Sequence, residues 1–188
     1  PVRRSGSSLK SLSQNSVPWY QAHSPRNVAD VAIHKRKLQD VNEALVSILM
    51  GQDDTRILLL TGPSGASKST VVTQLAKVLI PKYKQMHSGG FFCTQSDVNQ
   101  DSTDESVIEY GNDGKFQSES FQEFLSHAKY KVGPNLALIL IEDIPNVFHV
   151  GTRQMFQRNL LEWLYNSETT LPPLVICLTE CELESDTG

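Results

Sequence analysis

The sequence predicts an α/β fold in which a parallel sheet lies between two layers of helices. Short apolar runs alternate along the chain with longer stretches whose apolar residues recur at helical spacing. Strands that alternate with helices form parallel sheets, because each connecting helix packs back onto the sheet. Two of the apolar runs lead into residues suited to a charged ligand: a turn rich in glycine and serine, and a pair of carboxylates.

Length and composition are those of one globular domain with a flexible extension. The chain has 188 residues, of which 39% are hydrophobic and 20% charged, and its formal net charge is −4. This acidic balance argues against a protein that coats DNA with its whole surface, and it leaves local DNA contacts open. No apolar run approaches the ~20 residues that cross a bilayer, so we expect no membrane association. Three cysteines do not make a disulfide framework and favour a reducing compartment.

Composition divides the chain into three parts. Residues 1–16 are rich in serine and predict a disordered lead-in. Residues 17–182 carry the alternating pattern of the core, interrupted by a polar and acidic insertion at about 84–118. Residues 183–188 form a polar tail. We expect the sequence to be a fragment, truncated there from a longer protein.

The first half of the core predicts a helix, a strand and a second helix. Apolar residues at helical intervals indicate a helix over about 34–49. The continuous apolar run at 56–61 predicts a strand that is buried on both faces. Residues 68–80 carry apolar side chains on one helical face, and Pro81 is expected to end that helix.

The second half predicts three strands and two helices. A short strand is expected at 106–110 and is followed by a helix over about 116–130. Residues 136–141 predict a second central strand. An amphipathic helix over 152–165 and a further strand at 174–178 complete the pattern.

The turn after the first strand is the most informative segment. It nearly matches the phosphate-binding motif G-x-x-x-x-G-K-[ST]. Its residues are Gly62, Pro63, Ser64, Gly65, Ala66, Ser67, Lys68, Ser69 and Thr70. In such a loop the backbone N–H groups converge on phosphate oxygens, and the following helix adds its positive end. The lysine reaches the β- and γ-phosphates and the first hydroxyl after it binds Mg²⁺, so we predict ATP and Mg²⁺ as ligands.

One position of this loop departs from the motif. Ser67 stands where the motif has a glycine before the lysine. Serine tolerates fewer backbone conformations than glycine, so we expect strain or an altered loop. The alternative is a strand–turn–helix with a chance lysine. The flanking apolar strand and amphipathic helix disfavour that alternative, because they are the context that the motif requires.

Two carboxylates, Glu142 and Asp143, follow the apolar run at 136–141. They fall at the carboxyl edge of the predicted sheet, where ligands bind in α/β folds. Glu142 takes the position of the Mg²⁺ ligand and Asp143 that of the group that orients the attacking water. The usual order is Asp then Glu, and aspartate is one methylene shorter, so slow hydrolysis is expected. An ordinary strand end is the alternative, which the phosphate loop upstream makes less favourable.

Several segments together resemble the large subunit of the DNA-damage-checkpoint clamp loader in its fungal form. They are Trp19-Tyr20 with Pro25, the stretch from Val31 to Lys35, the phosphate loop, and the segments 142–146 and 175–180. The fungal form is similar at both departures as well, since it tolerates serine before the lysine and the Glu-Asp order.

The resemblance implies an AAA+ ATPase core whose lid and collar domains would lie beyond Gly188. Members of this family work beside four small replication-factor-C subunits and load a heterotrimeric, ring-shaped checkpoint clamp onto damaged DNA in the nucleus. The resemblance also implies that Val31 and Ala32 lie near the adenine. It puts Thr179 at the sensor position, where a polar side chain would respond to the γ-phosphate.

Three functions follow from these patterns. The first is an ATP-dependent switch in a clamp loader. The second is an ATP-binding scaffold with little or no turnover, which Ser67 and the short Asp143 favour. The third is a small-molecule kinase, which is disfavoured because only Arg153 and Arg158 occur late in the chain, where such a kinase carries an arginine-rich lid. AAA+ sites usually need an arginine from a neighbouring subunit, so the isolated fragment is expected to hydrolyse ATP poorly.

Overall fold

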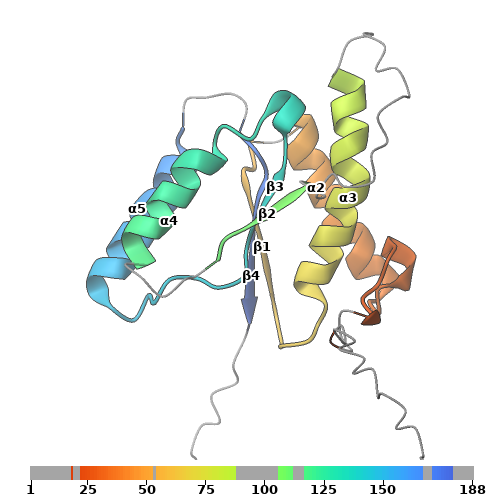
Figure 1. Ribbon diagram of the computed structural model, residues 1–188, viewed down its shortest axis with the longest axis horizontal. Helices are drawn as coiled ribbons and strands as arrows, with labels where there is room; N and C mark the ends of the chain where they lie inside the picture. Colours follow the sequence, from red (N-terminus) through yellow and green to blue (C-terminus); the bar gives the residue numbers. More distant parts are fainter. Residues whose placement is uncertain are drawn as a thin grey trace, which may run out of the picture.

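Two layers of helices enclose a four-stranded sheet in the computed structural model of the chain (Figure 1). The structure describes Pro18 and residues 22–52, 54–87, 106–111, 117–166 and 171–179, without the side chains of 117–119. In chain order the elements are η1 (Val28–Asp30), α2 (Lys35–Met50), β1 (Ile57–Gly62), α3 (Lys68–His87), β2 (Val107–Glu109), α4 (Gln117–Ala128), η2 (Gly133–Asn135), β3 (Leu138–Ile141), α5 (Val150–Leu164) and β4 (Leu174–Thr179).

All four strands are parallel and lie in the order β1-β4-β3-β2. Strand β4 therefore separates β1 from β3, with Thr179 opposite Gly62 on one side and Ile176 opposite Ile141 on the other. Every residue of β3 is buried, as expected for a strand covered on both faces. The same expectation for the strand at 56–61 is wrong: β1 lies at the edge of the sheet, no residue of it is fully buried, and Leu59 is 53% exposed. The predicted α/β fold with a parallel central sheet is confirmed, and the carboxyl ends of β1, β4 and β3 meet at one edge.

The side chains of β3 alternate between the two helical layers. Leu138 and Leu140 join the apolar cluster that includes α2 and α3, whereas Ile139 and Ile141 join the cluster of α4 and α5. Figure 1 shows α2 and α3 on one side of the sheet and α4 and α5 on the other. Alternation of this kind follows from the two-residue period of a strand, and it holds the sheet rigidly between the layers.

Helix α2 has a local signal at each end. The Nδ1 atom of His34 accepts a hydrogen bond from the backbone N–H of Arg36 at 3.3 Å. Gly51 ends the helix with φ at 60°, a left-handed conformation that glycine adopts without steric cost. The observed helix agrees closely with the predicted 34–49.

The prediction that Pro81 ends the second helix is wrong. Helix α3 continues through Pro81 to His87. A proline inside a helix removes one backbone hydrogen bond and costs about 3 kcal/mol. Packing of apolar residues on both sides of Pro81 offsets this free energy. Ile80 is fully buried in the core, and Tyr83 is partly buried against the same cluster. Tertiary packing thus outweighs the local signal.

The remaining predicted elements are observed with small shifts of their bounds. The strand at 106–110 is β2, the helices at 116–130 and 152–165 are α4 and α5, and the strands at 136–141 and 174–178 are β3 and β4. The predicted lead-in, most of the polar insertion and the polar tail lie outside the described residues, as do Trp19 and Tyr20. No helix of the described segments has the length and hydropathy needed to cross a membrane.

Candidate nucleotide-binding site

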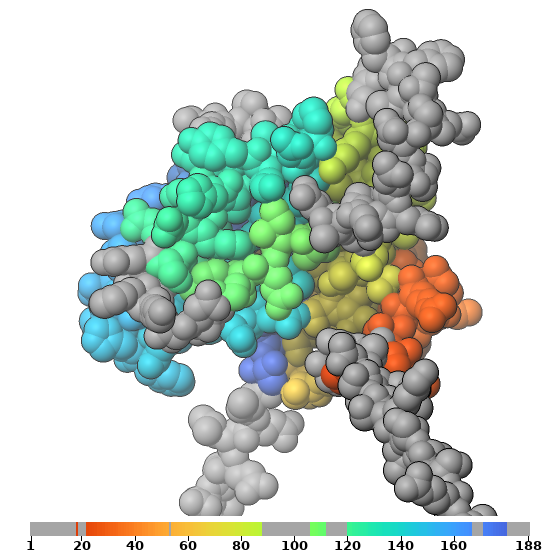
Figure 2. Space-filling model, in the orientation of Figure 1, coloured from red at the N-terminus to blue at the C-terminus, as the bar shows by residue number. Residues whose placement is uncertain are grey.

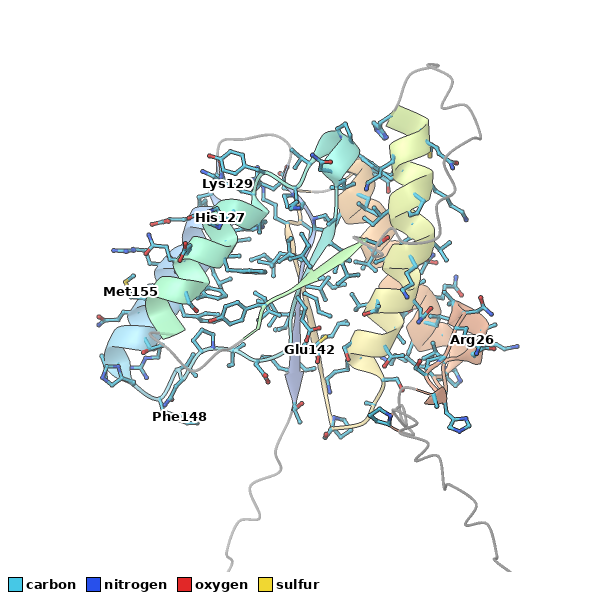
Figure 3. All side chains as sticks on the ribbon, in the orientation of Figure 1. Arg26, His127, Lys129, Glu142, Phe148 and Met155 are labelled. Atoms are coloured by element: carbon cyan, nitrogen blue, oxygen red, sulfur yellow. The ribbon has the colours of Figure 1, made fainter. Side chains whose placement is uncertain are left out.

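A hollow of about 320 Å³ opens at the carboxyl edge of the sheet. Its lining consists of seven consecutive residues of the predicted phosphate loop together with side chains from the ends of β3 and β4. The residues are Ser64, Gly65, Ala66, Ser67, Lys68, Ser69, Thr70, Glu142, Asp143, Cys177 and Thr179. The structure thereby brings together the loop, the acidic pair and the predicted sensor threonine. Figure 3 shows Glu142 near this lower edge of the sheet.

The backbone of the loop turns sharply at two glycines. The φ angles are 149° at Gly62 and 75° at Gly65, where glycine is favoured over residues with a side chain. A Cβ atom placed on either glycine would meet no atom within 4 Å, so both positions face open space. The N–H of Ala66 donates to the carbonyl oxygen of Pro63 at 3.4 Å and closes the turn between them. This shape lets a ligand approach the backbone closely.

Ser67 adopts the left-handed conformation that the motif normally assigns to glycine, with φ at 59°. It is the one residue other than glycine with a positive φ among the described residues. The carbonyl of Ser67 accepts the N–H of Val71 at 3.0 Å and so begins α3. A left-handed non-glycine residue costs about 1–2 kcal/mol, so the loop keeps the motif's shape with stored strain.

Lys68 folds back over the loop. Its Nζ donates to the carbonyl oxygens of Gly62 at 3.0 Å and Pro63 at 2.8 Å. Lys68 is also the first residue of α3, a helix of 20 residues whose N-terminus borders the hollow. The ammonium group and the positive end of the helix both favour an anion in this hollow.

A third carboxylate, Glu109, lies near the acidic edge without lining the hollow. Glu142 and Asp143 follow β3, and Glu109 ends the neighbouring strand β2, in register with Leu140. Partial burial and the charges of Glu142 and Asp143 raise the pKa of Glu109 above its ordinary value. Sequence reasoning missed Glu109, although its place at the end of a predicted strand was a usable signal.

Cys177 connects the loop with the acidic edge. It is buried in β4, between β1 and β3. Burial, assisted by the charge of Glu142 and opposed by that of Lys68, raises the pKa of the Cys177 thiol to about 11. The thiol is therefore neutral at physiological pH. Cys177, Lys68 and Glu142 all line the same hollow.

Four predicted binding residues, Gly62, Pro63, Val31 and Ala32, do not line this hollow. Val31 is buried in the apolar cluster with α3, and Ala32 is exposed. The next residue, Ile33, lines a separate groove of about 460 Å³ beside β1, together with Gly62 and Pro63. The stretch thus lies close to the loop, and its contact with adenine stays a prediction.

A larger hollow of about 570 Å³ lies elsewhere, among the C-terminal ends of α2 and α3 and the segments that precede β3 and β4. Its lining is mostly apolar and contains none of the predicted site residues. The smaller hollow is the functional candidate, since it joins the anion-binding loop to the carboxylates.

A parallel sheet that carries this loop, this lysine and an acidic strand end at one edge defines a P-loop nucleotide-binding domain. The chain belongs to the Rad17 family: the family described as the Rad17 P-loop domain matches residues 11–188.

Similar proteins agree with this membership. Checkpoint protein RAD24 of Saccharomyces cerevisiae is 52% identical over 169 residues, which cover 88% of this chain and 25% of that protein. Cell cycle checkpoint protein RAD17 of Homo sapiens is 29% identical over 161 residues, covering 73% of this chain and 22% of its own length. The replication factor C large subunit of Methanococcoides burtonii is 30% identical over 64 residues, or 34% and 13% of the two chains. The chain thus spans about a quarter of the length of its checkpoint relatives.

Proposed function

We propose that this domain binds ATP and Mg²⁺ as the AAA+ module of the checkpoint clamp loader, which loads a heterotrimeric sliding clamp onto damaged DNA in the nucleus. The observation that carries the proposal is the single hollow that joins loop, lysine, carboxylates and sensor threonine. Residues 17–182 would form the AAA+ core. The similarity to two checkpoint proteins and to a replication factor C large subunit supports a role beside four small replication-factor-C subunits.

The loop and the start of α3 fit a polyphosphate. The open space at Gly62 and Gly65 leaves room for phosphate oxygens near the backbone. Lys68 now donates to two neutral carbonyls, and a phosphate oxygen is a stronger acceptor for an ammonium group. We infer that the lysine exchanges these carbonyls for the β- and γ-phosphates, while Val31 and Ala32 stay the candidates beside the adenine.

The oxygen donors of the site fit Mg²⁺. Ser69 offers a hydroxyl and Glu142 a carboxylate, and both line the hollow. Magnesium ions in nucleotide sites take one or two protein oxygens and complete their shell with phosphate oxygens and water. Ser69 and Glu142 would therefore hold the ion, which when bound offsets charge on the phosphates.

Asp143 and Thr179 would act on hydrolysis. Asp143 would accept a hydrogen bond from the attacking water and orient it, and Thr179 would respond to the γ-phosphate from the end of β4. Thr179 lies opposite Gly62 in the sheet, so it stands between the loop and the acidic edge. This position suits a side chain that reports nucleotide state to the rest of the assembly.

Calorimetric titration with ATP and Mg²⁺ tests the proposal directly. The Lys68→Ala variant should bind ATP about 100-fold more weakly than the parent, because a charged hydrogen-bond donor to the phosphates is lost. Lys129→Ala, a lysine after α4 that does not line the hollow, is the control and should leave affinity unchanged. Equal affinities for the parent and Lys68→Ala would refute ATP binding by this loop.

An ATP-binding scaffold with little or no hydrolysis is the second candidate. The short Asp143 favours it, because its carboxylate reaches less far towards the attacking water than a glutamate would. The left-handed Ser67 favours it too, because the loop keeps its shape only under strain. Turnover by the full assembly that disappears in Asp143→Asn would exclude the scaffold.

A further inference from the structure

Helix α5 carries an uncharged stripe along its solvent-exposed face. The stripe consists of Val150, Gln154, Gln157, Leu161 and Leu164, which follow one another at alternating intervals of four and three residues. Val150, Leu161 and Leu164 are 55%, 50% and 40% exposed, and both glutamines are exposed as well. Large apolar side chains normally avoid such exposure when they lie together on one face of a helix.

The opposite face of α5 packs on the protein core. Asn159 and Trp163 are each 4% exposed, and they lie on the side of the helix turned away from the stripe. In the space-filling view, the light-blue atoms of this helical layer form the outer left margin of the molecule (Figure 2). The stripe is thus a second apolar face, which the described part of the chain leaves uncovered.

The spacing of the stripe is that of a seam between two helices. Apolar residues at alternating three- and four-residue intervals place a continuous row along one side of a helix, where a second helix packs. Protein interfaces exclude charged side chains from their centre, as this stripe does. The two central glutamines suit such a seam too, because polar residues at seam positions fix the register of the partner helix.

The flanks of the stripe indicate the charge of that partner. Arg153 and Arg158 lie on its two sides, and both are exposed. Arg158 forms an ion pair with Glu162 at 3.6 Å, in which both side chains are more than half exposed. An exposed pair of this kind contributes about 0–1 kcal/mol, so Arg158 can exchange it for a carboxylate of a partner. Acidic flanks on the partner helix would match both arginines.

Aromatic side chains stand at both ends of the stripe. Phe148 is 94% exposed and Tyr165 is 83% exposed. The turn before α5 holds Phe148 in place, because its N–H donates to Oδ1 of Asn146 at 3.1 Å and the preceding Pro145 is fully buried. Figure 3 shows Phe148 projecting from the lower left of the molecule, away from Glu142. Aromatic side chains presented on a rigid turn are frequent anchors of protein interfaces.

We propose that α5 docks a helix of a neighbouring protein chain, whose contacting face is apolar and whose flanks carry carboxylates. With 15 residues, α5 offers a seam of about 22 Å, or four turns. A nucleic-acid strand fits less well, because the stripe itself holds no cation that would neutralise phosphates. The neighbour is taken to be a subunit of the assembly named in the proposed function, on which this inference rests.

The test uses the full-length protein assembled with its partner subunits. Leu161→Glu should weaken assembly about 10-fold or more, because it places a charge in the centre of the seam. The double variant Arg153→Glu with Arg158→Glu should also weaken assembly and should do so less at high salt, since like charges would face each other across the flanks. Met86→Glu changes an exposed apolar residue on α3, 65% exposed against 50% for Leu161, and should assemble normally.

Crosslinking from Gln157→Cys identifies the occupant. A crosslink to an acid-flanked helix of a partner subunit, lost in Leu161→Glu, supports the proposal. Crosslinks confined to a second copy of this chain, or loss of DNA binding with assembly intact, overturn it. Normal assembly of both Leu161→Glu and the arginine double variant also overturns it. ATP binding by the same variants should be unchanged, so a failure here is distinguishable from a failure of nucleotide binding, which Lys68→Ala reports.

Discussion

The Nζ atom of Lys68 lies 2.8 Å from the carbonyl oxygen of Pro63, within the same loop that it is expected to serve. A second carbonyl, that of Gly62, accepts from the same ammonium group at 3.0 Å. The lysine is therefore held over the loop by acceptors that a phosphate would outcompete. These bonds are partly exposed, so they stabilise the fold little.

Removal of this lysine should consequently separate binding from folding. We expect Lys68→Ala to lose no more than about 2 kcal/mol of stability, because each of the two hydrogen bonds of the lysine contributes about 1 kcal/mol net. Urea unfolding followed by circular dichroism measures this, and the ATP titration described above measures binding. A large loss of stability would show that the lysine is structural.

Ser67→Gly should stabilise the loop. Glycine removes the cost of the left-handed conformation, and its greater freedom in the unfolded chain takes part of the gain back, which leaves up to about 1 kcal/mol. The control is Ser64→Gly in the same loop, where the backbone is not left-handed, and there glycine should be neutral or destabilising. Thermal unfolding of both variants decides the matter. Equal effects at the two positions would mean that Ser67 is not strained.

Asp143 should limit turnover by its length. We expect Asp143→Glu to raise ATP turnover of the full assembly, since one more methylene brings the carboxylate towards the water. Asp143→Asn should lower turnover by about 100-fold or more, as expected on loss of a general base. Steady-state phosphate release measures both, with ATP affinity as the control. Unchanged turnover in both variants would leave Asp143 without a role in hydrolysis.

The Cys177 thiol should make stability fall at alkaline pH. Its pKa is raised from an ordinary 9.0 to about 11 in the folded chain. Between these values the unfolded chain loses the proton and the folded chain keeps it, so the folded state loses stability as pH rises through this window. Below pH 9 the full contribution is present. Urea unfolding at pH 8 and at pH 10.5 should show a larger drop for the parent than for Cys177→Ala, and equal drops would contradict the shift.

Asn159 should be a position where an apolar residue is better than the native one. It is 4% exposed, and neither its Oδ1 nor its Nδ2 has a hydrogen-bond partner in the structure. An unsatisfied buried polar group costs about 1–3 kcal/mol, so Asn159→Leu should raise the midpoint of thermal unfolding. Gln157→Leu, on the exposed side of the same helix, serves as the comparison and should change the midpoint little. A lower midpoint for Asn159→Leu would reveal a partner such as a buried water.

The sequence determined the local features of this protein by itself. Continuous apolar runs predicted the strands, and the full burial expected of such runs holds for β3 and not for β1, which lies at the sheet edge. The spacing of Gly62, Lys68 and Ser69 predicted a phosphate loop because a few consecutive residues supply its backbone donors. Even the strain at Ser67 could be anticipated, since the motif requires glycine at that place.

Tertiary structure alone decided which of these features meet. Strand order put β4 between β1 and β3, so Thr179 and Cys177 came to lie between the loop and the acidic edge. Glu109 came close to that edge because β2 pairs with β3 after a long insertion. Helix α3 continues through Pro81 because burial of its apolar residues in the core on one side of the sheet stabilises the helix. Contacts between distant segments depend on topology and packing. The free energy of this packing exceeds the local conformational preferences, and a short stretch of sequence contains no pattern from which such contacts can be predicted.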